Sequence, residues 1–146
     1  VTDTGYGVSQ ILPVLGMIWW AGIRRSDRHS SLRGANTTQT LAIEQPELHL
    51  HPAHQAKLAD VFSGAIRQGK GDPRRADVRL VVETHSEALI NRLGELIEDG
   101  KISHDDVQIV IFSAEDDINS PTDVSLAQFD EGGVLNNWPF GFFNYS

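Results

Sequence analysis

The chain has 146 residues, of which 40% are hydrophobic and 22% are charged, and its formal net charge at pH 7 is −8. This length is enough for one hydrophobic core and too short for two independent ones. The absence of cysteine excludes a disulfide framework and any thiolate metal site, and it fits a reducing cytosol. We therefore expect a single globular core from a cytoplasmic protein.

The negative charge is concentrated at the end of the chain. Residues 1–101 contain all twelve Lys and Arg and twelve of the twenty Asp and Glu, so the remaining eight acids follow Lys101 without a base. Such an acidic tail repels nucleic acid. One basic cluster is Arg24, Arg25, Arg28 and Arg33. It could contact phosphates, but a solvated loop is the simpler interpretation.

The first apolar segment predicts a buried helix from about Ser9 to Ile23. It is shorter than the roughly 20 residues that span a bilayer, so no membrane contact is expected. Pro13 would lie in the first turn, where its missing N–H does little harm. The polar stretch that follows, Arg24–Gln39, predicts a loop.

Three short apolar runs predict β-strands, at Thr40–Glu44, Val78–Glu83 and Val107–Phe112. A helical pattern lies in each of the two intervals between them. The first helix would start at Pro52, and the second would be capped by Ser86 and would stop near Gly100.

Alternating strands and helices predict an α/β fold with right-handed crossovers and a parallel sheet. The runs Leu80–Val82 and Ile109–Ile111 are apolar at every position, as is typical of buried parallel strands. Beyond Ser113 the pattern changes, and Asp130–Gly133 predicts a hairpin turn between two short strands. We expect a main lobe at residues 1–113 and a β-rich carboxy-terminal extension at 114–146, with the final aromatic residues packed back on the sheet.

Polar side chains follow two of the predicted strands at the point where each strand ends. Glu44-Gln45-Pro46-Glu47 comes after the first strand, and Glu83-Thr84-His85-Ser86 comes after the second. In an open parallel sheet, ligands bind beyond the carboxyl ends of the strands. Acids and a histidine at this edge suit a divalent metal, a nucleotide phosphate and an attacking water.

Three segments together resemble the carboxy-terminal half of an ABC-class ATPase head, a P-loop NTPase. Leu41–Pro52 resembles the Walker B strand and D-loop, and its Pro-Glu-Leu-His-Leu-His-Pro run is typical of the SMC-like and OLD-like AAA ATPases. Leu80–Ser86 resembles the switch strand that ends in the H-loop histidine, and Thr4–Gln10 resembles a variant of the signature motif. The aromatic end, Trp138–Phe143, is similar to an uncharacterised module attached to some of these ATPases.

The resemblance implies ATP and Mg²⁺ as cofactors and a role for each residue at the strand ends. Glu44 would hold Mg²⁺ through its water shell, because a carboxylate is the hard ligand that this ion prefers. Gln45 stands where the water-activating glutamate usually stands, and an amide can orient a water but cannot take its proton. Glu47, two residues on, is a candidate substitute for that glutamate, and His85 would donate a hydrogen bond to the γ-phosphate.

The resemblance also implies a homodimer with ATP sandwiched between two heads. Gly5, Gly7, Ser9 and Gln10 belong to the signature segment, which faces the nucleotide held by the other subunit. Backbone N–H groups and a hydroxyl at a helix start favour a bound anion. Since related ATPases act on DNA or in defence against phage, DNA or a nuclease is the expected further partner.

The phosphate-binding loop of such an ATPase, G-x-x-x-x-G-K-[ST], does not occur in the 146 residues. We expect this loop to lie upstream in a longer parent protein. The chain alone should therefore bind ATP weakly or not at all.

Two other functions stay open at this point. His49, His51 and His54 are close in sequence and could bind the metal of a metal-dependent hydrolase. Alternatively, Gln45 marks lost chemistry, and the chain is a non-catalytic dimerisation module that ATP switches. Purely structural roles also exist, such as a helix cap for Ser9.

Overall fold

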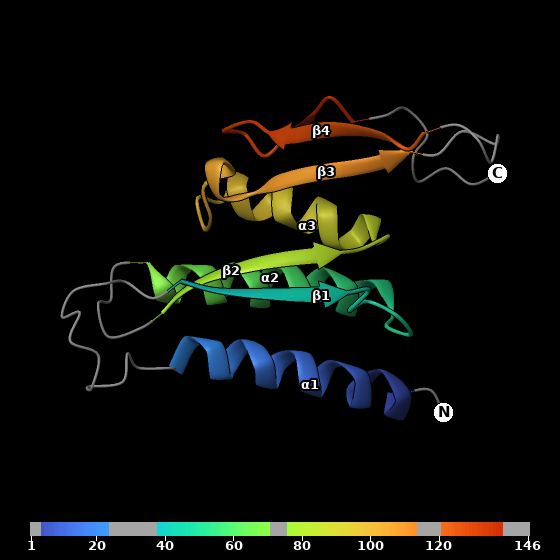
Figure 1. The fold of residues 1–146 in the computed structure, drawn as a ribbon, viewed down its shortest axis with the longest axis vertical. Helices are drawn as coiled ribbons and strands as arrows, with labels where there is room; N and C mark the ends of the chain where they lie inside the picture. Colours follow the sequence, from blue (N-terminus) through green and yellow to red (C-terminus); the bar gives the residue numbers. More distant parts are fainter. Residues whose placement is uncertain (1–3, 24–37, 71–75, 114–120, 139–146) are drawn as a thin grey trace. The chain divides into compact units, whose positions relative to one another are not determined.

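The computed structural model describes residues 4–23, 38–70, 76–113 and 121–138 of the chain (Figure 1). The fold is α/β, with the following elements: α1 (Thr4–Ile23), β1 (Thr38–Glu44), α2 (Pro52–Gly69), β2 (Asp77–Glu83), α3 (Glu87–Glu98), the 3₁₀ helix η1 (His104–Asp106), β3 (Gln108–Ser113), β4 (Asp123–Phe129) and β5 (Leu135–Asn136). They form two compact units, 1–92 and 93–146. The predictions for the arginine cluster and for the aromatic residues after Trp138 lie outside the described residues.

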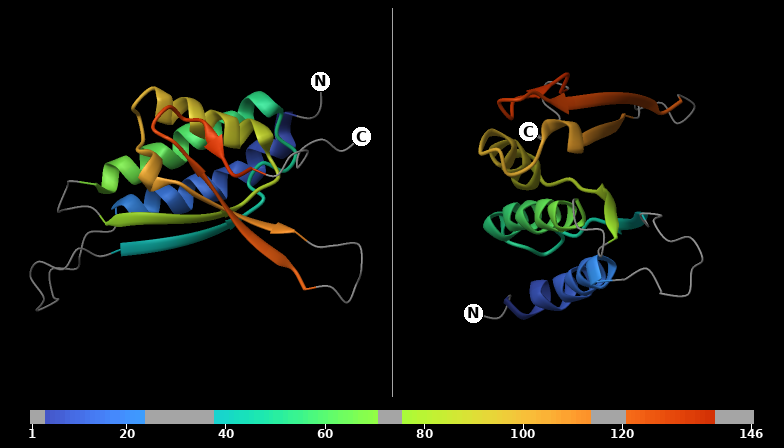
Figure 2. Two further views of the ribbon diagram at one scale, coloured as in Figure 1. Left: turned by 90° about the horizontal axis from the view of Figure 1, so that it is seen from above. Right: turned by 90° about the vertical axis from the view of Figure 1, so that its left-hand side faces the viewer.

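In the unit of residues 1–92, β1 and β2 form the predicted parallel pair. Their register runs from Thr38 opposite Asp77 to Glu44 opposite Glu83. Helix α2 is the crossover between them and lies along one face of the pair (Figure 2). The buried apolar residues of this unit are Ile18, Ala21, Ile43, Leu58, Ala59, Phe62, Ala76, Val78, Leu89 and Ile90. The opposite face of the pair is exposed in this chain, and Val81 on it is 61% exposed.

The predicted ends of the second and third helices are confirmed. Pro52 is the first residue of α2, where a missing N–H does no harm. Ser86 caps α3, because its Oγ accepts the N–H of Leu89 at 3.1 Å. Gly100 ends the helix with φ of 66°, a left-handed conformation that glycine adopts without strain.

Helix α1 differs from its prediction in its burial and at its start. A buried helix is predicted, but Leu12, Trp19 and Trp20 are each more than half exposed, and Ile18 and Ala21 are buried. It begins at Thr4, so Ser9 lies in the second turn and Pro13 lies in the interior rather than in the first turn. The interpretation of Ser9 as a helix cap is therefore wrong. The prediction starts too late because it follows the apolar run, which begins near Ser9, whereas the helix also includes Gly5 and Gly7, which are poor helix formers. None of the described helices has the length and hydropathy that a membrane-spanning segment needs.

In the unit of residues 93–146, β3, β4 and β5 form a three-stranded sheet in that order, and both pairings are antiparallel. The hairpin turn at Asp130–Gly133 is confirmed, since Gly133 N donates to Asp130 O at 3.0 Å and Asp130 N donates to Val134 O at 2.9 Å. The prediction that Val107–Phe112 joins the parallel sheet is wrong. The strand β3 pairs with β4, which follows it after the short segment 114–122, and a short link suits antiparallel neighbours. The strand therefore pairs with the strand after it in the sequence rather than with β2 before it.

Two glycines bring backbone against backbone in this unit. A Cβ on Gly133 would lie 2.1 Å from the carbonyl oxygen of Gly94, and a Cβ on Gly94 would lie 2.6 Å from the carbonyl oxygen of Gly133. Only glycine fits at either position, so the end of α3 packs directly on the β4–β5 turn. The buried apolar residues of this unit are Leu96, Ile97, Ile102, Ile111, Ala127 and Phe129.

Candidate functional site

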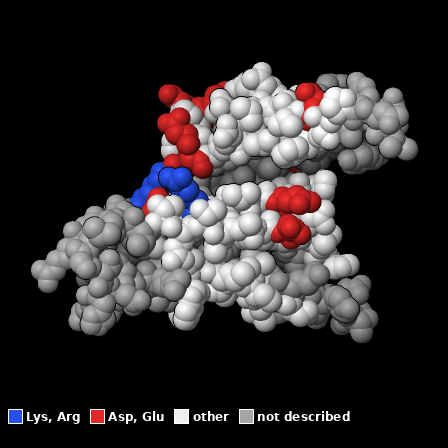
Figure 3. Space-filling view, viewed as in Figure 1, with Lys and Arg blue, Asp and Glu red and all other residues white. Residues whose placement is uncertain are grey.

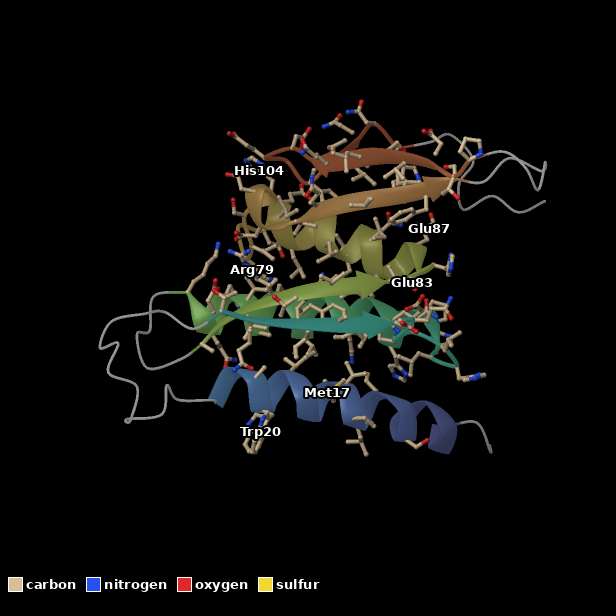
Figure 4. The ribbon with its side chains drawn as sticks, viewed as in Figure 1. Met17, Trp20, Arg79, Glu83, Glu87 and His104 are labelled. Carbon is tan, nitrogen blue, oxygen red and sulfur yellow. The ribbon has the colours of Figure 1, made fainter. Side chains whose placement is uncertain are left out.

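The carboxyl ends of β1 and β2 carry two acids side by side. Glu44 and Glu83 are the last register partners of the parallel pair, both are exposed, and neighbouring strands lie about 4.8 Å apart. Figure 3 shows their acidic surface at this end of the two strands, and Figure 4 labels Glu83 there. The sequence interpretation assigned a role to Glu44 alone. The equivalent position of Glu83 at its own strand end was the signal that could have identified it.

The loop after β1 consists of two consecutive tight turns. Gln45 has φ of 42°, and its N–H donates to Glu83 O at 2.8 Å, which extends the pairing one residue beyond the strands. Leu48 N then donates to Gln45 O at 3.2 Å, and Leu50 N donates to Glu47 O at 3.0 Å. The left-handed φ of Gln45 turns the chain sharply, so Glu47 enters the interior instead of following Glu44 to the surface.

Glu47 is a buried carboxylate, only 5% exposed. Its Oε1 accepts the backbone N–H of His85 at 2.7 Å, which joins the loop after β1 to the loop after β2. Within the described part of the chain, Glu47 Oε2 is a buried side-chain oxygen without a hydrogen-bond partner. A buried carboxylate that is bound to a backbone N–H fixes the position of its partner. At 5% exposure it lies behind the surface, whereas the substitute base predicted from the sequence would have to reach the attacking water.

His85 is held by its backbone, and its imidazole is exposed. The residues on either side are also fixed, because Ser86 N donates to Thr84 Oγ1 at 3.1 Å. The imidazole is therefore carried on an ordered loop at the same end of the sheet as Glu44. The structure places Glu44, Glu47 and His85 at the same end of the parallel pair, with Glu44 and His85 exposed and Glu47 turned into the interior.

Gln55 also belongs to this edge, and the sequence interpretation did not include it. Its side chain donates to Leu50 O at 3.0 Å and to Glu47 O at 3.4 Å, and it accepts the hydroxyl of Ser86 at 2.7 Å. A hydrogen bond between residues so far apart in the sequence leaves no periodic pattern.

The amino end of α1 lies at the same end of this unit as the carboxyl ends of β1 and β2 (Figures 1 and 2). Gly5 is in the first turn of α1, where backbone N–H groups have no partner within the helix. Gly7, Ser9 and Gln10 lie further inside the helix. Of the predicted signature residues, only Gly5 thus has the backbone position of a helix start.

The three histidines near the start of α2 do not gather around a common point. His51 caps α2, with its Nδ1 accepting the N–H of Ala53 at 3.3 Å. Its ring centroid lies 6.3 Å from that of His54, in an edge-to-face arrangement. Among residues 4–23, 38–70, 76–113 and 121–138, no group of three or more His, Asp or Glu side chains is placed to hold a metal ion. The arrangement therefore does not favour the metal-dependent hydrolase.

An apolar hollow of about 430 Å³ lies between α1 and β1, lined mainly by Pro13, Met17 and Trp20 of the helix and by Leu41 of the strand. Its walls lack the charged groups that a nucleotide phosphate needs. Figure 4 labels Met17 and Trp20 on α1.

The strand-end acids, the ordered histidine loop and the parallel pairing agree with a comparison to known families. The model of the family described as AAA ATPase domain matches residues 1–90. The chain belongs to the AAA ATPase domain family. The matched range lies within the unit of residues 1–92. Membership of this family supports ATP binding and hydrolysis, with Mg²⁺, in the protein that carries the domain. No curated protein and no solved structure matches the chain.

The nearest approach to a phosphate-binding loop in this AAA ATPase domain is Gly64–Gly71. It has the spacing of the two glycines and the lysine, but Gly71 stands where the motif needs Ser or Thr. Gly64–Gly69 also lies inside helix α2, rather than in a loop between a strand and a helix. A helix interior has its N–H groups bonded to its own carbonyl groups, so this segment cannot cradle a phosphate.

Proposed function

We propose that residues 1–92 supply the Walker B, D-loop and H-loop side of an ATP-hydrolysing site, and that the phosphate-binding loop comes from outside residues 1–146. The observation that carries the proposal is the strand-end arrangement of Glu44 beside Glu83, with His85 fastened to the adjoining loop through Glu47. The match of residues 1–90 to the AAA ATPase domain family also supports the proposal.

The groups at this edge fit Mg²⁺. Two neighbouring exposed carboxylates repel each other when no cation lies between them, and Mg²⁺ prefers carboxylate oxygen. Glu44 would hold the ion through its water shell, with Glu83 as the adjacent charge. When bound, Mg²⁺ neutralises the developing charge on the phosphate oxygens.

His85 and Gln45 would act on the γ-phosphate and on the attacking water. The exposed His85 imidazole would donate a hydrogen bond to a phosphate oxygen, while its backbone stays fixed by Glu47. The Gln45 amide would orient a water without taking its proton. Because Glu47 is 5% exposed, it would have to leave the interior to act as the base. Hydrolysis would then be slow, or would depend on a partner that opens this loop.

The proposal includes a homodimer in which ATP lies between two heads and the amino end of α1 faces the nucleotide of the second copy. The first-turn N–H groups around Gly5 carry the positive end of the helix dipole, which favours a phosphate. A DNA or nuclease partner and a cytoplasmic location complete the proposal.

The test is Mg²⁺-dependent ATP hydrolysis by the full-length protein that carries this domain. Glu44→Gln should reduce kcat by roughly a hundredfold or more, the size of effect seen when one charge-stabilising group is removed from an active site. Asp77→Asn is the matched control, because it removes one negative charge from the opposite end of the same strand pair and should leave kcat unchanged. Normal hydrolysis by Glu44→Gln would reject the proposal, as would tight Mg²⁺-dependent binding of ATP by the 146-residue chain alone.

A further inference from the structure

Gln55 uses both ends of its side chain to connect two loops. It lies in the first turn of α2, and its Nε2 donates to Leu50 O at 3.0 Å and to Glu47 O at 3.4 Å. Its Oε1 accepts the Ser86 hydroxyl at 2.7 Å. One amide therefore fastens the loop after β1 to the loop after β2.

Ser86 fixes which way the Gln55 amide points. Its hydroxyl has one proton, which goes to Gln55 Oε1, and it also accepts the N–H of Leu89 at 3.1 Å. A reversed amide would set its oxygen against the carbonyl oxygens of Leu50 and Glu47, so this orientation is the one that pairs every group. Ser86 is 4% exposed, and a break in such a buried network leaves polar groups without partners.

His85 lies between the two links that tie these loops together. Its own N–H is bound to Glu47 Oε1 at 2.7 Å, and the next residue is bound to Gln55. The direction of the exposed imidazole depends on both links, because they fix the backbone on each side of its Cα.

We infer that Gln55 is a positioning residue for His85: through Ser86 it sets where the imidazole stands relative to the end of β1. The inference rests on the proposed function for the part that concerns hydrolysis. A catalytic group that is misplaced by about 1 Å can lose up to a hundredfold in rate, so a group that never touches the substrate can still control kcat.

Helix α2 is also joined to helix α3 at a second point, away from the His85 loop, and this second contact provides the control. Arg92 Nη2 of α3 lies 2.8 Å from Asp60 Oδ1 of α2, and Arg92 Nε lies 3.2 Å from Asp60 Oδ2. Asp60→Asn weakens the contact between α2 and α3 without touching the His85 loop. It separates a general loss of helix packing from a loss of His85 placement.

The experiment has two arms in the full-length protein. In the first, amide hydrogen exchange of residues 84–89 is measured without nucleotide. Gln55→Ala should raise the exchange of His85 and Leu89 about fivefold, as expected for one lost hydrogen bond, and Asp60→Asn should not. Unchanged exchange in Gln55→Ala would overturn the inference whether or not the protein hydrolyses ATP.

In the second arm, ATP hydrolysis is measured. Gln55→Ala should lower kcat roughly tenfold with little change in KM. The double variant Gln55→Ala/Ser86→Ala should lose clearly less than the sum of the two single losses, because both single variants break the bond between Gln55 and Ser86, although Ser86→Ala also removes the cap of α3. Additive losses, or an equal loss of kcat in Asp60→Asn, would overturn the positioning role. If the unmodified protein does not hydrolyse ATP, the proposed function fails, while the exchange arm still decides whether Gln55 holds the loop.

Discussion

Residues 1–92 and residues 93–146 both combine helices with a small sheet, but they differ in what lies on the strands. In the first unit, acids stand at the strand ends and buried polar side chains join the loops behind them. In the second, one face of the antiparallel pair is apolar and exposed, and the cross-strand partners Val110–Leu126 and Phe112–Val124 lie on it. The first unit thus carries the candidate site at its strand ends, whereas the second has a close backbone contact between Gly94 and Gly133.

The two units show where the sequence pattern of a strand is informative. The apolar run in β3 looked like a strand buried on both faces, yet Val110 is 45% exposed and Ile111 is 3% exposed. An apolar run therefore cannot distinguish a parallel strand from an antiparallel one with an apolar outer face. The residues just beyond a strand carry more functional information than the strand itself.

The close contact between Gly94 and Gly133 should contribute strongly to the stability of the second unit. Gly133→Ala should destabilise the unit of residues 93–146 by about 3 kcal/mol or more, because it combines left-handed backbone strain with a forced clash. The new Cβ would lie 2.1 Å from Gly94 O, and the φ of Gly133 is 75°. Chemical denaturation followed by circular dichroism measures it.

Gly132→Ala is the control for this change. Its Cβ would meet only Asp130 Oδ1, at 3.4 Å, so the variant should unfold at nearly the same denaturant concentration as the unmodified protein. Equal losses in the two variants would mean that the contact between Gly94 and Gly133 does not hold this unit together.

A smaller effect tests the two faces of β3. Ile111→Ala should cost about 2–3 kcal/mol, since it opens a cavity under the sheet. Phe112→Ala, at the adjacent position with 67% exposure, should cost less than about 1 kcal/mol despite the larger side chain. Denaturation midpoints compare the two, and a greater loss in Phe112→Ala would show that a partner covers the outer face.

The next prediction concerns Gln45 in the candidate site of residues 1–92. Gln45→Glu supplies a carboxylate where the amide stands, so it should raise kcat roughly tenfold if proton transfer to that position limits hydrolysis. Steady-state hydrolysis at saturating ATP measures the change, with Gln45→Asn as the variant that keeps an amide. A Gln45→Glu protein that still binds ATP without faster turnover would favour the non-catalytic, ATP-switched module.

The smallest effect is a pH dependence in the β4–β5 turn. Hydrogen bonds hold the pKa of Asp130 below its usual 3.8, chiefly the bond from Val134 N–H, with further bonds from Asn136 and Gly132. A lowered pKa in the folded state means that this stabilisation is present above about pH 3.8 and is lost as the pH falls through the lower folded value. The amide signals of Gly132 and Val134 should shift only in that acidic range. Glu131→Gln should leave their titration unchanged, whereas Asp130→Asn should abolish it.

The sequence predicted those parts of the fold that depend on local chemistry. Pro52, Ser86 and Gly100 mark helix ends, because a missing N–H, a capping hydroxyl and a left-handed turn each need a particular residue type. The residues after β1 and β2 are singled out for another reason, which is that ligands bind beyond the carboxyl ends of parallel strands. The ordered motifs gave the ATPase family, which the comparison with known families supports for residues 1–90.

The remaining features depend on contacts between distant residues. The burial of Glu47 depends on the backbone of His85, and the role of Gln55 depends on Ser86; no spacing rule connects either pair. The contact between Gly94 and Gly133 is likewise visible only when the chain is folded. The early start of α1 was missed because weak helix formers can continue a helix once its other turns are in place.

The length of the two consecutive turns between Glu44 and Pro52 is fixed by the contacts of their residues. Gln45 continues the strand pairing, Glu47 must reach His85, and His51 already caps the next helix. An insertion or deletion of one residue would rotate Glu47 away from His85 or shift the register of α2. Related sequences should therefore tolerate substitutions in this loop more readily than any change in its length, and alignments of the family should show gaps elsewhere first.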